Sequence, residues 1–108
     1  MGKNTDKIYL IPDEIITPFV LKNKYWDYEI IKFIKKFKIK TNNVFLDIGA
    51  NIGLVSKQLI EANIKIKKFL CFEPNENSFE CLKLNLSSNK KVNLYNFGLG
   101  LKNQNLKL

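Results

Sequence analysis

The sequence contains no histidine and no arginine, so all eighteen of its basic residues are lysines. The absence of histidine removes the commonest general base and the commonest metal ligand of proteins, and we expect no metal site. Arginine is the residue best suited to bidentate recognition of phosphate and guanine. Its absence argues against specific nucleic-acid recognition, even though the formal net charge is +8.

Cysteine is also scarce. Cys71 and Cys81 are too far apart in the chain for a metal-binding or redox pair. We expect two reduced, packed thiols, as in a cytosolic protein. The N-terminus has no apolar signal segment, and Asp6 stands where myristoylation requires serine or threonine. No apolar run approaches the roughly 18 residues that a membrane span needs. The sequence therefore predicts a cytoplasmic protein that has no membrane-spanning segment.

The apolar residues that are present suffice for a folded core. They make up 45% of the 108 residues, and 12% of the chain is aromatic, which is typical of one small globular domain. Residues 1–24 have an irregular pattern, in which residues 8–11 could form a short strand and Pro12 and Pro18 break any longer element. We therefore divide the chain into an N-terminal arm, residues 1–24, and a domain, residues 25–108.

Hydrophobic periodicity after residue 24 predicts alternating helices and strands. The expected helices cover residues 25–37, 53–62 and 75–86, and the expected strands cover residues 44–48, 66–72 and 92–97, with a fourth strand beginning at 105–108. Alternation of this kind produces a parallel sheet with flanking helices, so the predicted fold class is α/β and Rossmann-like. The nearly continuous apolar run at 44–48 predicts a strand covered on both faces.

The helix expected at 25–37 is amphipathic and basic. One face carries apolar residues, namely Trp26, Ile30, Phe33, Ile34 and Phe37, and the other carries mostly lysines. Such a helix usually packs its apolar face on a sheet and exposes its lysines to solvent. The same pattern is compatible with a helix that binds nucleic acid or a membrane surface, and this alternative stays open.

A glycine turn follows the strand at 44–48. Gly49 and Gly53 bracket Asn51, and Asp47 stands two residues before the first glycine. We expect Asn51 to cap the following helix, and Asn75 to cap the helix after the next strand. Glu73 lies 24 residues after Gly49, near the spacing at which an acid accepts hydrogen bonds from ribose hydroxyls. The turn therefore predicts a site for a ligand that carries a ribose.

Two ligand classes fit a ribose site of this kind, dinucleotides and S-adenosylmethionine. A dinucleotide needs glycine at the second motif position, where this chain has Asn51, and its pyrophosphate would meet the carboxylate of Asp47. S-adenosylmethionine has no phosphate, and its methionine end carries an ammonium and a sulfonium group. The charge of Asp47 therefore favours S-adenosylmethionine.

Three segments then resemble one protein family in order and spacing: residues 47–53 (DIGANIG), residues 72–75 (FEPN) with the helix that follows, and residues 92–100 (VNLYNFGLG). The chain from about residue 40 resembles the FkbM-like group of class I S-adenosylmethionine-dependent methyltransferases. The resemblance implies a Rossmann-like methyltransferase fold and methyl transfer to a hydroxyl of a small molecule or glycan.

The same resemblance implies a set of cofactor-binding residues. They are Asp47, Gly49, Ala50, Asn51, Gly53, Glu73, Pro74 and Leu99. Residues 47–53 would hold the methionine part, Glu73 the ribose, and the segment around Gly98 and Leu99 the adenine. The family often has a Ser-Asp pair after the position of Leu99, whereas this chain has Gly100 and Leu101, which weakens the adenine assignment.

Other interpretations remain open at the level of sequence. Asp47 could merely accept backbone hydrogen bonds in the turn, and Glu73 could be an ordinary solvated acid. The resemblance also implies a sheet truncated after its third core strand. Either the chain is a fragment of a longer protein, or the apolar edge at 44–48 is covered by the arm or by another chain. No catalytic base is evident, so a non-catalytic binding or interaction module is the alternative to a methyltransferase.

Overall fold

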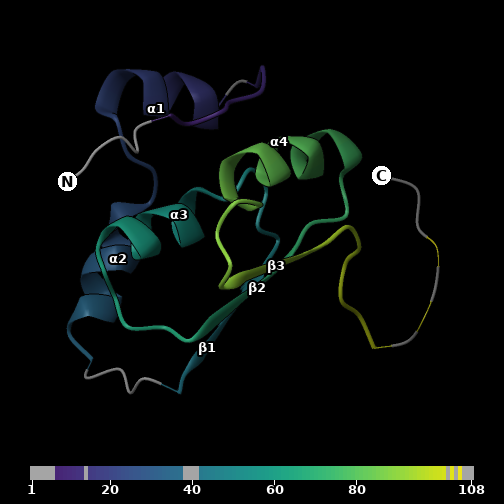
Figure 1. Cartoon of the computed structure of the whole chain (residues 1–108). Helices are drawn as coiled ribbons and strands as arrows, with labels where there is room; N and C mark the ends of the chain where they lie inside the picture. The colour runs from purple at the N-terminus through teal and green to yellow at the C-terminus, as the bar shows by residue number, and fades with distance from the viewer. Residues whose placement is uncertain (1–6, 14, 38–41, 102, 104, 106–108) are drawn as a thin grey trace.

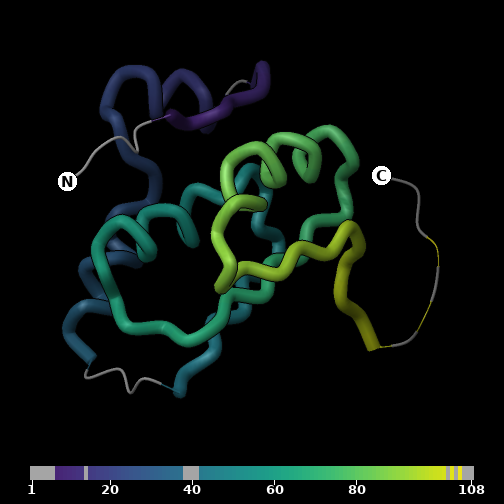
Figure 2. The backbone as a smooth tube through the Cα atoms, in the orientation of Figure 1, coloured from purple at the N-terminus to yellow at the C-terminus, as the bar shows by residue number. Residues whose placement is uncertain are grey.

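The computed structural model describes residues 7–13, 15–37, 42–101, 103 and 105. It is an α/β structure with a three-stranded parallel sheet and flanking helices, as the periodicity predicts (Figure 1). The elements in chain order are α1 (Ile16–Asn23), α2 (Tyr28–Lys35), β1 (Val44–Ile48), α3 (Leu54–Glu61), β2 (Lys68–Phe72), α4 (Glu76–Leu86) and β3 (Val92–Tyr95). A helix joins each strand to the next, and the chain can be followed through both crossovers in Figure 2.

The strands lie in the order β1-β2-β3, so β2 is central. In the register of the sheet, Phe45 lies beside Phe69 and Asp47 beside Cys71. Because side chains alternate between the two faces of a strand, these four residues share one face. Helices α3 and α4 lie over that face (Figure 1), and their apolar residues form the main core with it.

The opposite face of β1 is open in the described part of the chain. Val44, Leu46 and Ile48 are 50%, 54% and 62% exposed. The prediction that both faces of this strand are covered is therefore wrong for the described residues. Some apolar residues of the run at 44–48 lie on the face of the strand that points away from the helices.

The N-terminal arm is more regular than its two prolines suggested. It contains α1, and Pro18 lies in the first turn of that helix, where a missing N–H costs nothing because the first turn has no intrahelical acceptors. A carboxylate oxygen of Asp13 accepts hydrogen bonds from the N–H groups of Ile15 and Thr17, at 3.0 and 2.9 Å. Residues 8–11 form no strand.

The arm packs on the helices and not along the free edge of β1. A second apolar cluster joins Val20 of α1 to Ile52, Leu54 and Cys81, with Leu10 packed against it. Within the described ranges, β1 pairs with β2 alone. The suggestion that the arm covers the edge of the first strand is therefore wrong for residues 7–13 and 15–24.

Helix α2 is shorter than expected and buries a different stripe. It begins at Tyr28, and Ile31 is its fully buried residue, whereas the periodicity placed Ile30 and Phe33 on the buried face. Phe33 is 60% exposed and Phe37 is 56% exposed. The helix packs against α3, and Ile31 is the residue that it contributes to the main core.

Helix capping matches the prediction at one helix and not at the other. The Asn75 side chain accepts a 2.9 Å hydrogen bond from the N–H of Ser78 at the start of α4. At α3 the capping residue is Gly53, and no side chain caps the helix, so the prediction for Asn51 is wrong.

The expected fourth strand is not seen in the described residues. Asn105 belongs to no element, and residues 106–108 lie outside the described residues. Among the helices that are described, none has the length and apolar character needed to cross a membrane.

Candidate functional site

The turn after β1 is tied to the end of β2 by backbone hydrogen bonds. The N–H groups of Gly49 and Ala50 both donate to the carbonyl of Phe72, each at 2.9 Å. Gly49 has a φ of +77°, and a Cβ placed on it would meet no atom within 4 Å. The space beside Gly49 is open, so a ligand can approach the backbone closely there.

Gly53 performs a different task from Gly49. Its φ is +89°, and a Cβ there would lie 2.7 Å from Leu82 Cδ1 and 2.8 Å from Leu86 Cδ1. Glycine at this position allows the start of α3 to approach α4 closely. Gly53 was predicted as a ligand-binding residue, but in the structure its side-chain position faces the helix pair.

Asp47 is held by a serine that the sequence analysis did not identify. The hydroxyl of Ser56, a fully buried residue of α3, donates a 2.6 Å hydrogen bond to Asp47 Oδ2. Burial raises the pKa of Asp47; the Ser56 hydrogen bond opposes this rise and the charge of Glu73 adds to it. The carboxylate is thus anchored by Ser56 of α3, a residue outside the turn in which backbone hydrogen bonds were the alternative interpretation.

Glu73 is 8% exposed, so it is not an ordinary solvated acid. Its Oε1 accepts a 2.7 Å hydrogen bond from the N–H of Asn51, and its Oε2 accepts one of 2.9 Å from the N–H of Asn75. Asn51 presents its amide in this direction because its backbone is left-handed, with a φ of +54°. Each carboxylate oxygen keeps a second lone pair that can accept a further hydrogen bond.

A cleft of about 560 Å³ opens at the carboxyl end of β1, within the size range of ligand sites. Four of the residues predicted to bind the cofactor line it together: Asp47, Gly49, Ala50 and Asn51. The opposite wall comes from the N-terminal part of the chain. It consists of Ile16, Trp26, Asp27 and Ile30.

The lining of this cleft differs in charge from the rest of the molecule. It includes two acids, Asp27 and Asp47, and no lysine among the described residues, although the chain has eighteen lysines. Glu73 does not line the cleft, but its carboxylate accepts a hydrogen bond from the N–H of Asn51, which does. The cleft is therefore an electronegative site on a strongly basic protein.

The N-terminal wall is fastened to α3 by a glutamine. The side-chain amide of Gln58 donates to the carbonyl of Trp26 at 2.6 Å, and its Oε1 accepts from the N–H of Trp26 at 3.0 Å. The indole ring is also packed edge-on against Phe19, with 5.5 Å between ring centroids. This pairing fixes the segment that carries Trp26 and Asp27 at the cleft.

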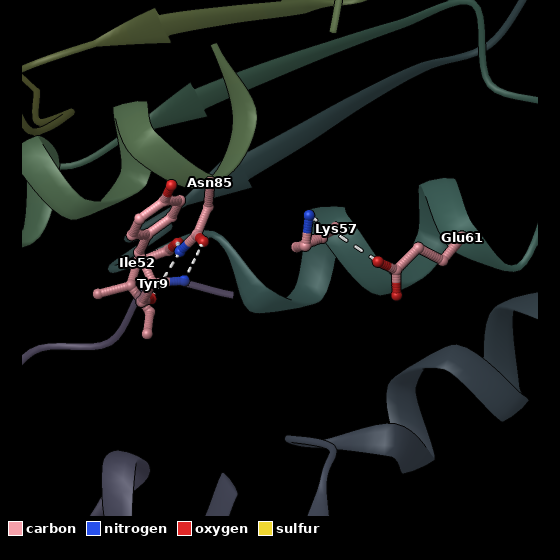
Figure 3. Close-up of polar contacts among 5 residues, drawn as sticks. All are labelled: Tyr9, Ile52, Lys57, Glu61 and Asn85. Carbon is pink, nitrogen blue, oxygen red and sulfur yellow. Dashed lines mark hydrogen bonds and ion pairs between the residues drawn. The ribbon is translucent and has the colours of Figure 1, made fainter. Parts of the chain in front are cut away.

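An asparagine fastens the arm in the same way at α4 (Figure 3). Oδ1 of Asn85 accepts from the N–H of Tyr9 at 2.6 Å, and Nδ2 donates to the Tyr9 carbonyl at 2.9 Å. The same Nδ2 donates to the carbonyl of Ile52 in the glycine turn at 2.7 Å. Neither the clamp of Gln58 nor that of Asn85 was predicted from the sequence, because a clamp between distant segments leaves no local pattern.

The remaining predicted residues follow the carboxyl ends of β2 and β3. They are Pro74 and Leu99. The Asn96 side chain donates to the Glu73 carbonyl at 2.8 Å and thereby ties the two strand ends together. A Cβ on Gly98 would lie 3.6 Å from Pro74 Cγ. Leu99 is exposed. Pro74 and Leu99 are thus not part of the cleft beside β1, although they lie at the ends of neighbouring strands.

Two further findings bear on the kind of site. The described residues contain no group of three or more cysteine or acidic side chains that could hold a metal ion. The scan against protein-family models gave no match, and the sequence matches no curated protein.

Proposed function

We propose that the cleft beside β1 binds S-adenosylmethionine and that the domain belongs to a methyltransferase that modifies a hydroxyl of a small molecule or glycan. The observation that carries this proposal is the charge of the cleft, which is lined by Asp27 and Asp47 and by no lysine among the described residues. A cationic ligand is favoured at such a site, and the pyrophosphate of a dinucleotide is repelled.

The residues of the site have distinct parts in this proposal. Asp47, oriented by Ser56, attracts the positive charge at the methionine end of the ligand. Because Gly49 has no side chain, the ligand can approach the backbone at this position. The free lone pairs of the Glu73 carboxylate accept hydrogen bonds from ribose hydroxyls, while its other lone pairs hold the turn. Pro74 and Leu99 follow at the ends of β2 and β3, in the direction in which adenine would extend.

S-adenosylmethionine supplies a methyl group on a positively charged sulfur. The chain's own contribution is to position that group and to exclude water from it, and positioning provides much of the rate of such a displacement. The half-buried ring of Trp26 forms an apolar wall next to the acids. An aromatic face stabilises a sulfonium or ammonium group through its quadrupole.

Calorimetry tests the proposal directly. We expect S-adenosylmethionine to bind and NAD to give no heat of binding. Asp47→Asn should weaken binding about tenfold or more, because a hydrogen bond to a charged group contributes about 1.5–3 kcal/mol. Glu80→Gln removes an equal charge from the exposed surface of α4 and should leave the affinity unchanged. Tighter binding of NAD than of S-adenosylmethionine would contradict the proposal.

A non-catalytic binding or interaction module is the second candidate. One observation favours it: both carboxylate oxygens of Glu73 already accept backbone hydrogen bonds, so this acid has a structural task even without a ligand. In that case neither ligand should bind, and Asp47→Asn should alter stability alone.

A further inference from the structure

Lysines gather at the amino-terminal ends of β2 and β3, the end of the sheet away from the cleft. Two backbone hydrogen bonds bring the segments together: the N–H of Phe69 donates to the Lys91 carbonyl at 2.8 Å, and the N–H of Lys67 donates to the Asn43 carbonyl at 2.9 Å. The lysines of these segments are all exposed. They are Lys65, Lys67, Lys68, Lys90 and Lys91, and we refer to them as the basic edge.

Few acids are close in the chain to the basic edge. No aspartate or glutamate occurs between residues 62 and 72 or after Glu80. The nearest acid before it, Glu61, forms an ion pair with Lys57 on α3 at 3.8 Å (Figure 3). The positive charges of the basic edge therefore reinforce one another at one end of the molecule.

The end of α2 adds exposed aromatic rings to the same end of the molecule. Phe33 and Phe37 pack edge to face, with 5.0 Å between ring centroids, and more than half of each side chain is exposed. Lys35 and Lys36 lie between them in the chain. Figure 1 shows the end of α2 and the start of β1 at the same end of the sheet.

Charge is therefore separated along the strands. Asp27, Asp47 and Glu73 lie at the carboxyl ends, and the basic edge lies at the amino ends. Strands of this length are about 16 Å long, beyond the roughly 8–10 Å over which salt screens charges at physiological ionic strength. Salt therefore weakens the effect that a charge bound at the basic edge has on the acids of the cleft.

We propose that the basic edge, together with Phe33 and Phe37, docks on the surface of an anionic lipid bilayer. Clustered lysines are attracted to anionic headgroups, and exposed bulky rings can enter the apolar boundary beneath them. A nucleic acid is the less suitable partner because the chain has no arginine for bidentate phosphate contacts. This docking leaves the cleft at the opposite end open to its ligand.

Co-sedimentation of the full chain with vesicles tests this proposal. Vesicles of phosphatidylcholine with phosphatidylserine should bind the chain, vesicles of phosphatidylcholine alone should not, and binding should fall with added salt. The double variant Lys67→Gln with Lys91→Gln should weaken binding about 25-fold, at about fivefold for each lysine. Lys7→Gln with Lys22→Gln removes the same charge outside the basic edge and should have a clearly smaller effect.

The aromatic part has its own matched pair of variants. Phe33→Ser should weaken vesicle binding, whereas Leu84→Ser, at a position on α4 that is 62% exposed, should not. Equal loss in both lysine pairs, or equal binding to both kinds of vesicle, would overturn the proposal. It would also be overturned if RNA bound through the basic edge and vesicles did not. Calorimetry with S-adenosylmethionine is a separate readout, so failure of one proposal leaves the other standing.

Discussion

The backbone N–H of Asn51 donates a 2.7 Å hydrogen bond to the side-chain carboxylate of Glu73. This bond joins the turn after β1 to the residue after β2. The second oxygen of the same carboxylate accepts the N–H of Asn75 at the start of α4. One nearly buried acid thus holds together the turn, the strand end and the next helix, and the shape of the cleft depends on it.

We predict that Glu73→Gln lowers the free energy of unfolding by about 2 kcal/mol. A glutamine side chain offers one acceptor oxygen, so one of the two backbone N–H groups loses its partner. Urea denaturation measures this loss. Glu80→Gln, at an exposed position on α4, should change stability by less than about 0.5 kcal/mol. Equal stabilities for wild type and Glu73→Gln would show that the carboxylate does not hold the turn.

The two glycines of the turn should respond differently to alanine. Gly53→Ala should destabilise by about 3 kcal/mol, because it combines a left-handed backbone with overlap against Leu82 and Leu86. Gly49→Ala should cost about 1–2 kcal/mol, since the backbone term alone applies. Its methyl group would enter the cleft, so ligand affinity should fall more than stability. Thermal denaturation and calorimetry on both variants separate these effects.

Trp26 is the only tryptophan of the chain, and its fluorescence reports on the wall of the cleft. Gln58→Ala removes both hydrogen bonds that hold its backbone. We expect a red shift of the emission as the indole gains exposure, with a loss of about 1–2 kcal/mol of stability. Asn85→Ala releases Tyr9 instead and should destabilise the protein without shifting the emission. A red shift in Asn85→Ala alone would contradict this account of the wall.

The pH dependence of stability should show the burial of Asp47. Its pKa in the folded protein is raised above 3.8 by burial, so the folded state binds the proton more tightly than the unfolded state. The associated stabilisation is complete below the unfolded pKa and is lost as the pH rises through the folded pKa. Asp47→Asn lacks this component, so its stability relative to wild type should increase as the pH rises from about 4 through the folded pKa of Asp47. Urea denaturation at several pH values provides the comparison.

The strands, the crossover helices and the turn residues of the cleft could be predicted from local patterns. Apolar runs and period-3.6 repeats are local signals, and so is the order of strand, Gly49 and helix. Which stripe of α2 is buried could not be predicted, because Ile31 and Ile30 are equally apolar and the packing partner decides. Whether the second face of β1 is covered depends on contacts that the strand itself does not encode.

The second wall of the cleft had no local signal at all. Gln58 and Trp26 are 32 residues apart, and Asn85 and Tyr9 are 76 residues apart. An isolated amide side chain gives no indication that it will pair with a distant backbone segment. Ser56 likewise reads as an ordinary helix residue until folding places its hydroxyl against Asp47. Gly53 resembles a ligand-binding glycine in sequence, although its lack of a side chain serves helix packing.

The central claim, that the cleft binds S-adenosylmethionine beside its acids, is tested most directly by titrating the ligand while the fluorescence of Trp26 is measured. We predict a saturable change in emission with a midpoint below about 1 mM, the upper end of common substrate affinities, and a weaker response in Asp47→Asn. A folded wild-type protein whose emission is unchanged by S-adenosylmethionine, with calorimetry that detects no binding, would contradict the claim.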